Sequence, residues 1–378
     1  MSITKSSHEK KKPDMQNKPL ILIGNDTSPS LPATAAALGM TVIPASIDSF
    51  ASGEPFVELF PKDRENAPAH AALLKDRDVV VVQSATDSIT HLLMMVHTLK
   101  AYGAGKVTVV MPFAPLMRQD RAFDNRFVSL GAAFAASQLK AAGADGVVTM
   151  TPHSQAAIKA YRDIFGDAFK VVSSTALFAP DIQKRFGTHP ATLAIGAPDG
   201  ADKAADEGQK RARRLAKAVF GRDDDDVMFL ISKTHTGVSD TKITGFKGDV
   251  AGKDCVIIDD MIDGGSTMLN AAHLLKAKGA KSVTAFASHG ILSGNALEKI
   301  LSARADGQRF SIDRLVLADT LPSVAQKIAA LAKTQPKLAA RADVMETAGP
   351  LLRAAAQDAA QPQAPAVHNI HPLRKKSS

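Results

Sequence analysis

The chain has 378 residues, of which 45% are hydrophobic and 22% are charged, a composition typical of folded α/β proteins and a length sufficient for two domains. Its net charge of +8 lies mostly at the ends, because residues 1–18 and 362–378 each carry a net charge of +3, which argues against nucleic-acid binding as the main function. The single cysteine, Cys255, excludes an intrachain disulfide, and no apolar run reaches membrane-spanning length, so we expect a cytoplasmic protein with no membrane or nucleic-acid partner.

Short apolar runs alternate with helical patterns through the first half of the chain. Residues 1–18 contain few apolar side chains, so we expect them to be disordered. Strands are predicted at residues 20–23, 41–43, 56–60, 79–82, 106–112 and 146–150. Helices are predicted at residues 30–38, 88–102 and 130–142. This alternation predicts a sheet of parallel strands with helices on both faces.

The alternation begins again in the second half. Strands are predicted at residues 191–195, 227–231, 256–258, 282–288 and 314–318, together with a long basic helix at 203–220. The sequence therefore predicts an α/β protein with two tandem doubly wound parallel-sheet domains, the first at 19–165 and the second at 166–320. We expect terminal helices at 321–361 and a disordered tail at 362–378.

The stretch that follows the strand at 256–258 carries the clearest chemical signal. Its polar and glycine residues are Asp259, Asp260, Asp263, Gly264, Gly265, Ser266 and Thr267. Glycines and a helix N-terminus present backbone N–H groups to a phosphate, and the two hydroxyls can bind its oxygens. The adjacent carboxylates would repel a phosphate, but they can accept hydrogen bonds from sugar hydroxyls or bind a hydrated Mg²⁺. The stretch therefore predicts a site for a phosphorylated sugar, although the same residue types are also common in turns and helix caps.

This loop resembles the phosphoribosyl-pyrophosphate loop that type I phosphoribosyltransferases share with ribose-phosphate pyrophosphokinases. The matching residues are Asp259, Asp260, Asp263 and Thr267, whereas Gly264 and Ser266 replace a Thr and a Gly. Further motifs, in order from about Leu20 to Leu321, resemble those of the pyrophosphokinases. A phosphoribosyltransferase usually needs only one such domain, so the resemblance is closer to the pyrophosphokinase family.

The resemblance implies two domains of the phosphoribosyltransferase type. It also implies an enzyme that transfers the pyrophosphoryl group of ATP to the C1 hydroxyl of ribose 5-phosphate, with Mg²⁺ as cofactor. Members of the family are homo-oligomers whose active sites borrow residues across a subunit boundary. We therefore expect a dimer or a hexamer.

The resemblance assigns a role to individual residues in each motif. The ATP-binding set is Phe50, Ser52, Glu54, Arg118, Gln119, Asp120 and Arg126, of which the first three serve a neighbouring subunit. Ribose 5-phosphate is expected at the loop from Asp259 to Thr267. The metal-associated residues are His153 and Asp199, and the catalytic residues are Lys233, His235 and Arg118.

Three positions depart from the family pattern. Thr151 replaces an Asp, Ser52 replaces an Asn or Asp, and His235 replaces an Arg. Because a neutral His stabilises less charge than an Arg, an alternative function is a catalytically weakened homologue with a regulatory or partner-binding role. A transferase that consumes phosphoribosyl pyrophosphate is a third hypothesis, but it leaves the first domain unexplained.

The residue types alone also allow structural interpretations. Arg118 and Arg121 are compatible with a loop of surface ion pairs, His153 with a cap at a strand or helix end, and Lys233 with an ordinary exposed lysine. The four consecutive aspartates at 223–226 are typical of a solvated loop, because adjacent carboxylates repel one another.

Overall fold

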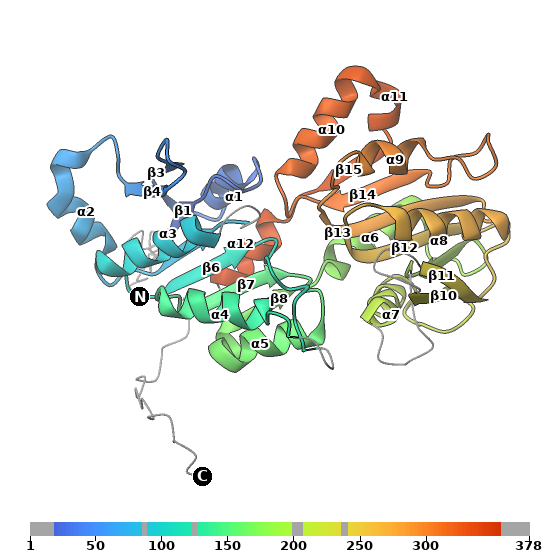
Figure 1. Ribbon diagram of the computed structural model, residues 1–378, viewed down its shortest axis with the longest axis horizontal. Coiled ribbons are helices and arrows are strands. Elements are labelled where there is room, and N and C mark those ends of the chain that lie inside the picture. Colours follow the sequence, from blue (N-terminus) through green and yellow to red (C-terminus); the bar gives the residue numbers. More distant parts are fainter. Residues whose placement is uncertain (1–18, 85–88, 123–126, 199–206, 236–240, 357–378) are drawn as a thin grey trace, which may run out of the picture.

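A computed structural model of the chain describes residues 19–84, 89–122, 127–198, 207–235 and 241–356. Within these residues the chain forms two large sheets and one two-stranded hairpin. Figure 1 shows the two large sheets beside each other, accompanied by their helices. None of the helices in these ranges is both long and apolar enough to cross a membrane.

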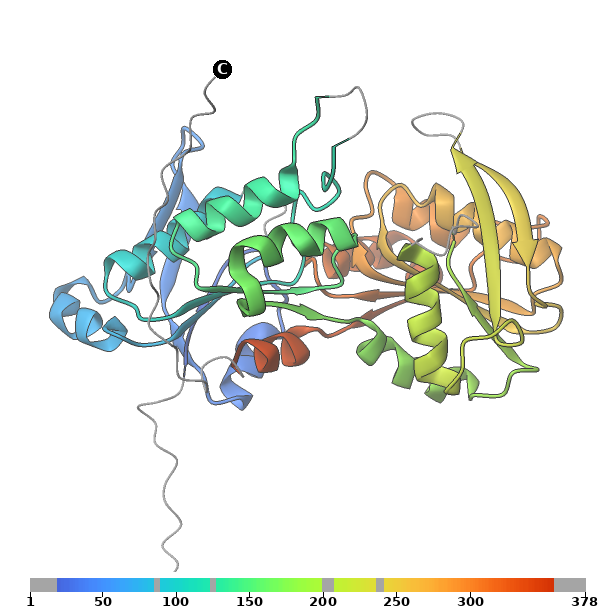
Figure 2. The ribbon, with the colours of Figure 1, turned by 90° about the horizontal axis from the view of Figure 1, so that it is seen from below.

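The first sheet contains six parallel strands in the order β2-β1-β5-β6-β7-β8. These strands are β1 (Leu20–Ile23), β2 (Thr41–Ile43), β5 (Val79–Val82), β6 (Val107–Met111), β7 (Gly146–Met150) and β8 (Phe169–Val172). Its central strands are runs of Val, Ile and Leu that are buried on both faces, as parallel sheets require. The helices on one face are α3 (Ile89–Ala101), α4 (Gly131–Ala141) and α5 (Gln155–Phe165), and those on the other are α1 (Leu31–Ala37) and α12 (Ala348–Ala356) (Figure 2).

The second sheet contains seven strands in the order β11-β10-β9-β12-β13-β14-β15, and only β10 and β11 pair antiparallel. These strands are β9 (Leu193–Gly196), β10 (Met228–His235), β11 (Thr241–Lys247), β12 (Asp254–Ile262), β13 (Ser282–Gly290), β14 (Arg314–Ala318) and β15 (Ala342–Met345). One face packs against α6 (Thr175–Phe186) and α7 (Glu207–Phe220). The other packs against α8 (Ser266–Ala277), α9 (Ala296–Ser302), α10 (Ser323–Thr334) and α11 (Pro336–Ala339).

This architecture confirms the predicted fold class of two doubly wound parallel sheets. Three strands are longer than the sequence predicted, and two of them, β12 and β10, carry predicted site residues. β12 continues through Asp259 and Asp260 because β13 pairs with it along its whole length, and β10 continues through Lys233 and His235 because β11 pairs with it. The predicted site residues Asp259, Asp260, Lys233 and His235 therefore lie within strands, where the backbone is held by pairing.

Several elements of the structure were not predicted from the sequence. They are β3 (Ala45–Ser49), α2 (Ala67–Leu74), α5, β8, α6, β11 and β15. The strand β15 lies inside the segment 321–361, for which only helices were expected. The first sheet extends beyond residue 165 through β8, and α12 returns from the far end of the chain to pack against it. We propose a domain boundary after β8, with α12 as part of the first domain.

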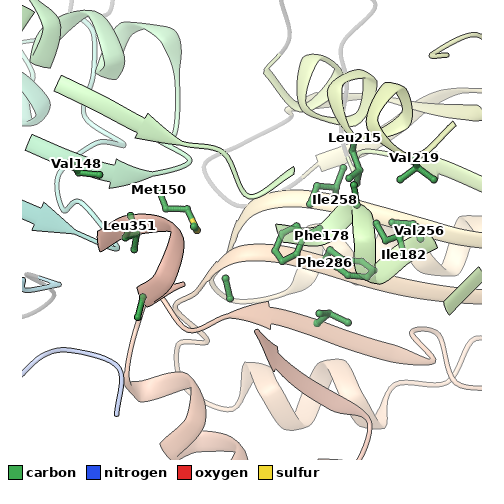
Figure 3. Close-up of a cluster of buried hydrophobic side chains, with 14 of the residues drawn as sticks. Val148, Met150, Phe178, Ile182, Leu215, Val219, Val256, Ile258, Phe286 and Leu351 are labelled. Atoms are coloured by element: carbon green, nitrogen blue, oxygen red, sulfur yellow. The ribbon is translucent and has the colours of Figure 1, made fainter. Parts of the chain in front are cut away.

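A continuous apolar cluster connects the two halves of the chain. Figure 3 shows Met150 and Leu351 on the side of the first sheet and Phe178 and Phe286 on the side of the second. The rings of Phe178 and Phe286 meet edge to face, with 5.2 Å between their centroids, and both side chains are fully buried. Shared burial of this kind holds the two sheets together, because separating them would expose the cluster to water.

The loops that leave the carboxyl ends of the two sets of strands meet along a seam. The Ser84 hydroxyl, after β5, donates a hydrogen bond of 2.6 Å to the carbonyl of Thr320, after β14. His289 Nε2, near the end of β13, lies 3.2 Å from the carbonyl oxygen of Thr151, after β7. Open α/β sheets bind their ligands outside the carboxyl ends of strands, so this seam is where a site is expected.

Asp319 joins three parts of the molecule at the seam. Its carboxylate accepts hydrogen bonds from the Ser28 hydroxyl (2.5 Å), which follows β1, and from the Thr347 N–H and hydroxyl (both 2.7 Å), which precede α12. Only 7% of Asp319 and 1% of Thr347 are exposed. The carboxylate therefore satisfies the two buried donors of Thr347 and one donor of the partly buried Ser28.

We expect Asp319→Ala to lower the free energy of unfolding by about 2 to 4 kcal/mol, because it leaves a buried N–H and two hydroxyls without their acceptor. Asp319→Asn keeps an oxygen acceptor and should cost less. Asp163→Ala, which removes an exposed carboxylate on α5, is the matched control and should change little. Urea denaturation of the three variants measures these differences, and an equal cost for all three would contradict the role of Asp319.

Candidate active site

A cavity of about 220 Å³ lies at the seam and brings together residues from both sheets. Arg118 and Gln119 reach it from the loop after β6, and His153 reaches it from the loop after β7. Met261 and His289 form its wall on the side of the second sheet. The structure thus places three of the predicted site residues around one cavity, next to the strand that carries the predicted sugar-phosphate loop.

Arg118 spans the seam to the sugar-phosphate loop. Its guanidinium Nη1 lies 3.1 Å from Asp263 Oδ2, and both side chains are substantially exposed. The Ser293 hydroxyl and the Arg118 guanidinium lower the pKa of Asp263, against a smaller opposing effect of burial. An exposed guanidinium with one carboxylate partner retains N–H donors that can bind an incoming phosphate.

His153 makes a second connection across the seam. Its Nδ1 lies 2.7 Å from Asp260 Oδ2, so the imidazole donates a hydrogen bond to the carboxylate. Arg211, on α7, binds the same pair of carboxylates from the other side, with Nη1 2.9 Å from Asp259 Oδ1 and Nη2 3.1 Å from Asp260 Oδ1. Arg211 is only 6% exposed and Asp260 only 5%. The four side chains form one cluster, in which Arg211 and Asp260 are buried and 35% of the His153 side chain is exposed.

The cluster keeps Asp260 ionised although it is buried. Burial alone would raise the pKa of Asp260, but the hydrogen bond from His153 and the charge of Arg211 outweigh that effect and lower it. Asp259 also accepts a hydrogen bond of 2.8 Å from the Asp260 backbone N–H. Asp260 is therefore held as an anion, and both carboxylates have fixed hydrogen-bond partners.

The loop after β12 presents the first turn of α8. Gly265 precedes the helix in the left-handed conformation, with φ 77°, and a Cβ at this position would lie 2.6 Å from Ile300 Cδ1, so only glycine fits. Gly264 has open space around it. Ser266 and Thr267 begin the helix, and the Ser266 hydroxyl accepts a hydrogen bond of 3.0 Å from Lys299 Nζ. The loop thus combines a helix N-terminus, hydroxyls and a nearby cation, which together suit a phosphate.

Asp120 stabilises the start of α5 next to His153. Only 3% of the Asp120 side chain is exposed. Its carboxylate accepts a hydrogen bond from the Ser154 hydroxyl and lies 3.3 Å from Arg121 Nε. Ser154 in turn accepts a hydrogen bond of 3.1 Å from the Ala157 N–H as the N-cap of α5. Arg121 thus pairs with its neighbour Asp120, as the ion-pair interpretation of the loop expected.

Two residues that line the cavity have backbone conformations that side chains other than glycine rarely adopt. Leu116 has φ 61° and Thr151 has φ 37°. For a β-branched residue such as Thr151 this conformation is strained, and strain of this kind collects at functional sites. His289, in contact with the Thr151 carbonyl, is fully buried, and burial lowers its pKa to about 4. The imidazole is therefore neutral near pH 7.

The hairpin that contains Phe50 lies apart from this cavity. β3 and β4 (Pro55–Leu59) are joined by a turn in which the Phe50 N–H donates to the Glu54 carbonyl, and Phe50 is 55% exposed. Ser52 and Glu54 are also exposed. Figures 1 and 2 show the hairpin at the side of the first sheet that is remote from the second sheet. These residues do not join Arg118 within one chain.

The other four predicted site residues lie either outside the described residues or in the last part of β10. Arg126 and Asp199 lie outside the described residues. Lys233 and His235 belong to the last part of β10, where the backbone pairs with β11 after a register shift between Ser232 and Lys233. Among the described residues, no three His, Cys, Asp or Glu side chains gather closely enough to form a metal site by themselves.

Arg211 and Ser293 are not among the site residues predicted from the sequence. The pattern of α7 contains a signal for Arg211, because Gly208, Leu215 and Val219 follow the same buried side of the helix at intervals of three and four residues. An arginine within an apolar stripe is normally paired when it is buried.

Comparisons with known proteins agree with this geometry. Residues 20–143 match the family described as the N-terminal domain of ribose phosphate pyrophosphokinase, and residues 221–335 match the phosphoribosyl synthetase-associated domain. The ribose-phosphate pyrophosphokinase of Hyphomonas neptunium is 33% identical over 301 residues, which cover 79% of this chain and 85% of that protein. That of Granulibacter bethesdensis is 34% identical over 287 residues, which cover 75% of this chain and 83% of that protein.

A solved structure shows the same fold. The crystal structure of phosphoribosylpyrophosphate synthetase from Mycobacterium smegmatis matches 90% of this chain and 98% of its own chain, with a TM-score of 0.68 and 26% sequence identity. The fold and the facing loops define a two-domain α/β enzyme of the phosphoribosyltransferase type. The chain belongs to the ribose-phosphate pyrophosphokinase family. This membership confirms the resemblance and does not favour the non-enzyme alternative.

Removal of Arg211 should destabilise the protein and the site together. We expect Arg211→Ala to lower the free energy of unfolding by about 3 to 5 kcal/mol, because it leaves two adjacent carboxylates without their cation. Arg213→Ala is the matched control, since Arg213 lies on the same helix with 46% of its side chain exposed, and it should cost less than about 1 kcal/mol. Urea denaturation at pH 7 compares them, and equal midpoints would rule out the proposed cluster.

The same cluster predicts a dependence of stability on pH. Folding lowers the pKa of Asp260 from its ordinary value of 3.8, so its contribution to stability is fully present above that value and is lost as the pH falls below it. In Arg211→Ala the folded pKa moves back toward 3.8, so the variant should lose less additional stability between pH 4 and pH 2 than the parent protein does. If the free energy of unfolding fell equally in the parent protein and in Arg211→Ala between pH 4 and pH 2, this account would be contradicted.

Proposed function

We propose that this protein transfers the pyrophosphoryl group of ATP to the C1 hydroxyl of ribose 5-phosphate, forming phosphoribosyl pyrophosphate and AMP. The observation that carries this proposal is the meeting of two sets of loops at one cavity. Arg118 pairs with Asp263 at 3.1 Å, and His153 pairs with Asp260 at 2.7 Å. A nucleotide bound by the first sheet and a sugar phosphate bound by the second would therefore lie side by side.

The second sheet supplies the sugar-phosphate half. We assign the 5-phosphate to Gly264, Gly265, Ser266 and Thr267, where a helix N-terminus meets two hydroxyls. We assign the ribose hydroxyls to Asp259 and Asp260, because carboxylates held in place by Arg211 are fixed hydrogen-bond acceptors. Asp263 would orient the loop through Arg118 and Ser293.

The first sheet supplies the nucleotide half. Arg118 and Gln119 line the cavity and would bind the phosphates and base of ATP, with Asp120 fixing the adjacent start of α5. Arg126 is assigned to the same loop by resemblance alone. Phe50, Ser52 and Glu54 would serve the nucleotide site of a neighbouring subunit. Their exposure, and their position remote from the seam, support an oligomeric enzyme.

The donor chemistry suits a hydrated Mg²⁺ ion that is bound together with the nucleotide. Mg²⁺ prefers carboxylate oxygens and usually retains several waters and substrate phosphates as ligands. By resemblance, His153 and Asp199 would hold it, and the carboxylate of Asp260 lies 2.7 Å from His153. When bound, the ion neutralises charge on the phosphates.

Catalysis would then depend on positioning and on charge stabilisation. The C1 hydroxyl of the sugar attacks the β-phosphorus of ATP, the bond to the α-phosphate oxygen breaks, and AMP leaves. Arg118, Lys233 and His235 would stabilise the charge that develops on the transferring group. The single cysteine, Cys255, is buried in β12, and we propose that the enzyme acts in the reducing cytoplasm.

The function is tested by AMP formation from ATP. We expect AMP to appear only when ribose 5-phosphate, Mg²⁺ and folded protein are all present in a phosphate buffer. Absence of AMP above background would contradict the proposed function and favour the weakened homologue. Release of pyrophosphate on addition of phosphoribosyl pyrophosphate and a nucleobase would instead indicate a transferase.

The assigned role of Lys233 gives a sharper test within the same assay. We expect Lys233→Ala to lower kcat by about 100-fold or more, because it removes a cation from the transferring group. Lys247→Ala, on the neighbouring strand β11 with 64% of its side chain exposed, is the matched control and should retain activity. Circular dichroism checks that both variants fold, and equal turnover would remove Lys233 from the mechanism.

A further inference from the structure

A second and larger cavity lies along the same seam. Its volume is about 660 Å³, compared with about 220 Å³ for the candidate active site, and Phe113 lines both. The loops after β1 and β5 form its walls on one side, and the loops after β13 and β14 form them on the other. A cavity of this size can enclose a drug-sized molecule, and the proposed function leaves it without a ligand.

The position of this cavity follows from the strand order of the first sheet. The order β2-β1-β5-β6-β7-β8 places β2 on one side of β1 and all later strands on the other. The connections therefore diverge between β1 and β5, and such a switch point opens a crevice where α/β sheets commonly bind ligands. In the second sheet the switch point lies between β9 and β12, which is where the sugar-phosphate loop lies. The first sheet has a corresponding crevice.

The walls carry many uncharged hydrogen-bonding groups. The carboxamides are Asn25, Gln83 and Gln326, and the hydroxyls are Ser84, Ser293 and Ser323. The two residues of fixed opposite charge are Asp26 and Lys327, and His91 is the further titratable group. Lys327 Nζ donates hydrogen bonds of 2.7 and 2.9 Å to the carbonyls of Ile291 and Leu292, so much of its hydrogen-bonding capacity is used within the protein.

This balance of charges indicates the class of ligand. Among the described residues that line the cavity, Lys327 is the only one with a fixed positive charge, whereas a diphosphate or triphosphate is usually bound by several cations. Amides, hydroxyls and a carboxylate suit sugar hydroxyls and the edge of a heterocyclic base. Phe113, Ile291 and Leu321 provide an apolar wall against which a flat ring can pack. We propose that this cavity binds an uncharged nucleoside.

A ligand bound in this cavity should influence the position of the sugar-phosphate loop. Ser293 lines the cavity, and its hydroxyl hydrogen-bonds to Asp263, which pairs with Arg118. Ser84, in the opposite wall, is bonded to the Thr320 carbonyl across the seam. A nucleoside between these walls contacts both sheets, so it would favour one spacing of the seam over others.

The experiment measures nucleoside binding to the complete chain by isothermal titration calorimetry, with adenosine, inosine and uridine as probes. We expect saturable binding of at least one probe, with one site per chain, both with and without saturating ATP. Ser323→Trp fills the cavity and should weaken that binding at least tenfold. Ala329→Trp, an exposed position on the same helix α10 that does not line the cavity, is the matched control and should bind as the parent does.

Other outcomes overturn the proposal in distinguishable ways. No saturable binding of any probe, or equal binding by both tryptophan variants, would refute a nucleoside site here. Displacement of the probe by ATP would assign the binding to the catalytic cavity. Tighter binding of AMP than of adenosine, abolished by Ser323→Trp, would make the ligand a nucleotide instead. Because binding is measured directly, these results are independent of whether the proposed reaction occurs.

A second pair of variants covers the case in which Ser323→Trp does not fold. Asn25→Leu and Gln326→Leu remove carboxamides from opposite walls at exposed positions, with little change in side-chain volume. Each should weaken nucleoside binding at least fivefold while circular dichroism and the thermal midpoint stay unchanged. Unaltered affinity in both would refute the proposed contacts.

Discussion

The site depends on a buried cluster in which one cation holds two adjacent carboxylates. Arg211 bridges Asp259 and Asp260 from α7, while His153 approaches Asp260 from the first sheet. Two neighbouring carboxylates at the end of a buried strand would otherwise repel one another, or one would take up a proton. With the guanidinium in place the pKa of Asp260 is lowered, and both carboxylates have fixed hydrogen-bond partners. Since His153 comes from the other sheet, the same cluster also sets how the two halves meet.

The sequence was sufficient to predict the fold class, because unbroken runs such as Val79–Val82 and Val256–Ile258 are typical of buried parallel strands. It was also sufficient to group Arg118, Gln119 and His153 with the loop after β12, through the order of their motifs. It did not reveal β15 or α2, whose local patterns are weak and whose form depends on tertiary contacts. Nor did it reveal Arg211. The apolar spacing of α7 places Arg211 on the buried side of the helix, but its two carboxylate partners become apparent only from the packing of α7 against β12.

Thr151, which replaces an Asp of the family pattern, makes structural contacts that the sequence does not reveal. From the sequence alone it was a lost carboxylate beside the candidate metal residue His153. In the structure it has a left-handed backbone, its hydroxyl accepts a hydrogen bond of 3.0 Å from the Ser174 N–H, and its carbonyl faces His289. Thr151 thus connects the loop after β7 by hydrogen bonds to the start of α6 and to the second sheet. Its part in positioning His153 is as relevant to the departure from the family pattern as the charge it lacks.

Two doubly wound sheets that face each other at their carboxyl ends create one seam with two crevices, because each sheet has its own switch point. The crevice at β12 carries charged residues in pairs, which suits an anionic substrate whose charge must be balanced. The crevice between β1 and β5 carries amides and hydroxyls with few charges. Phe113 lines both cavities, and Ser293 connects the second to Asp263 of the first. The two crevices therefore share Phe113 and a hydrogen-bonded contact, and these are the structural route by which a ligand at one would influence the other.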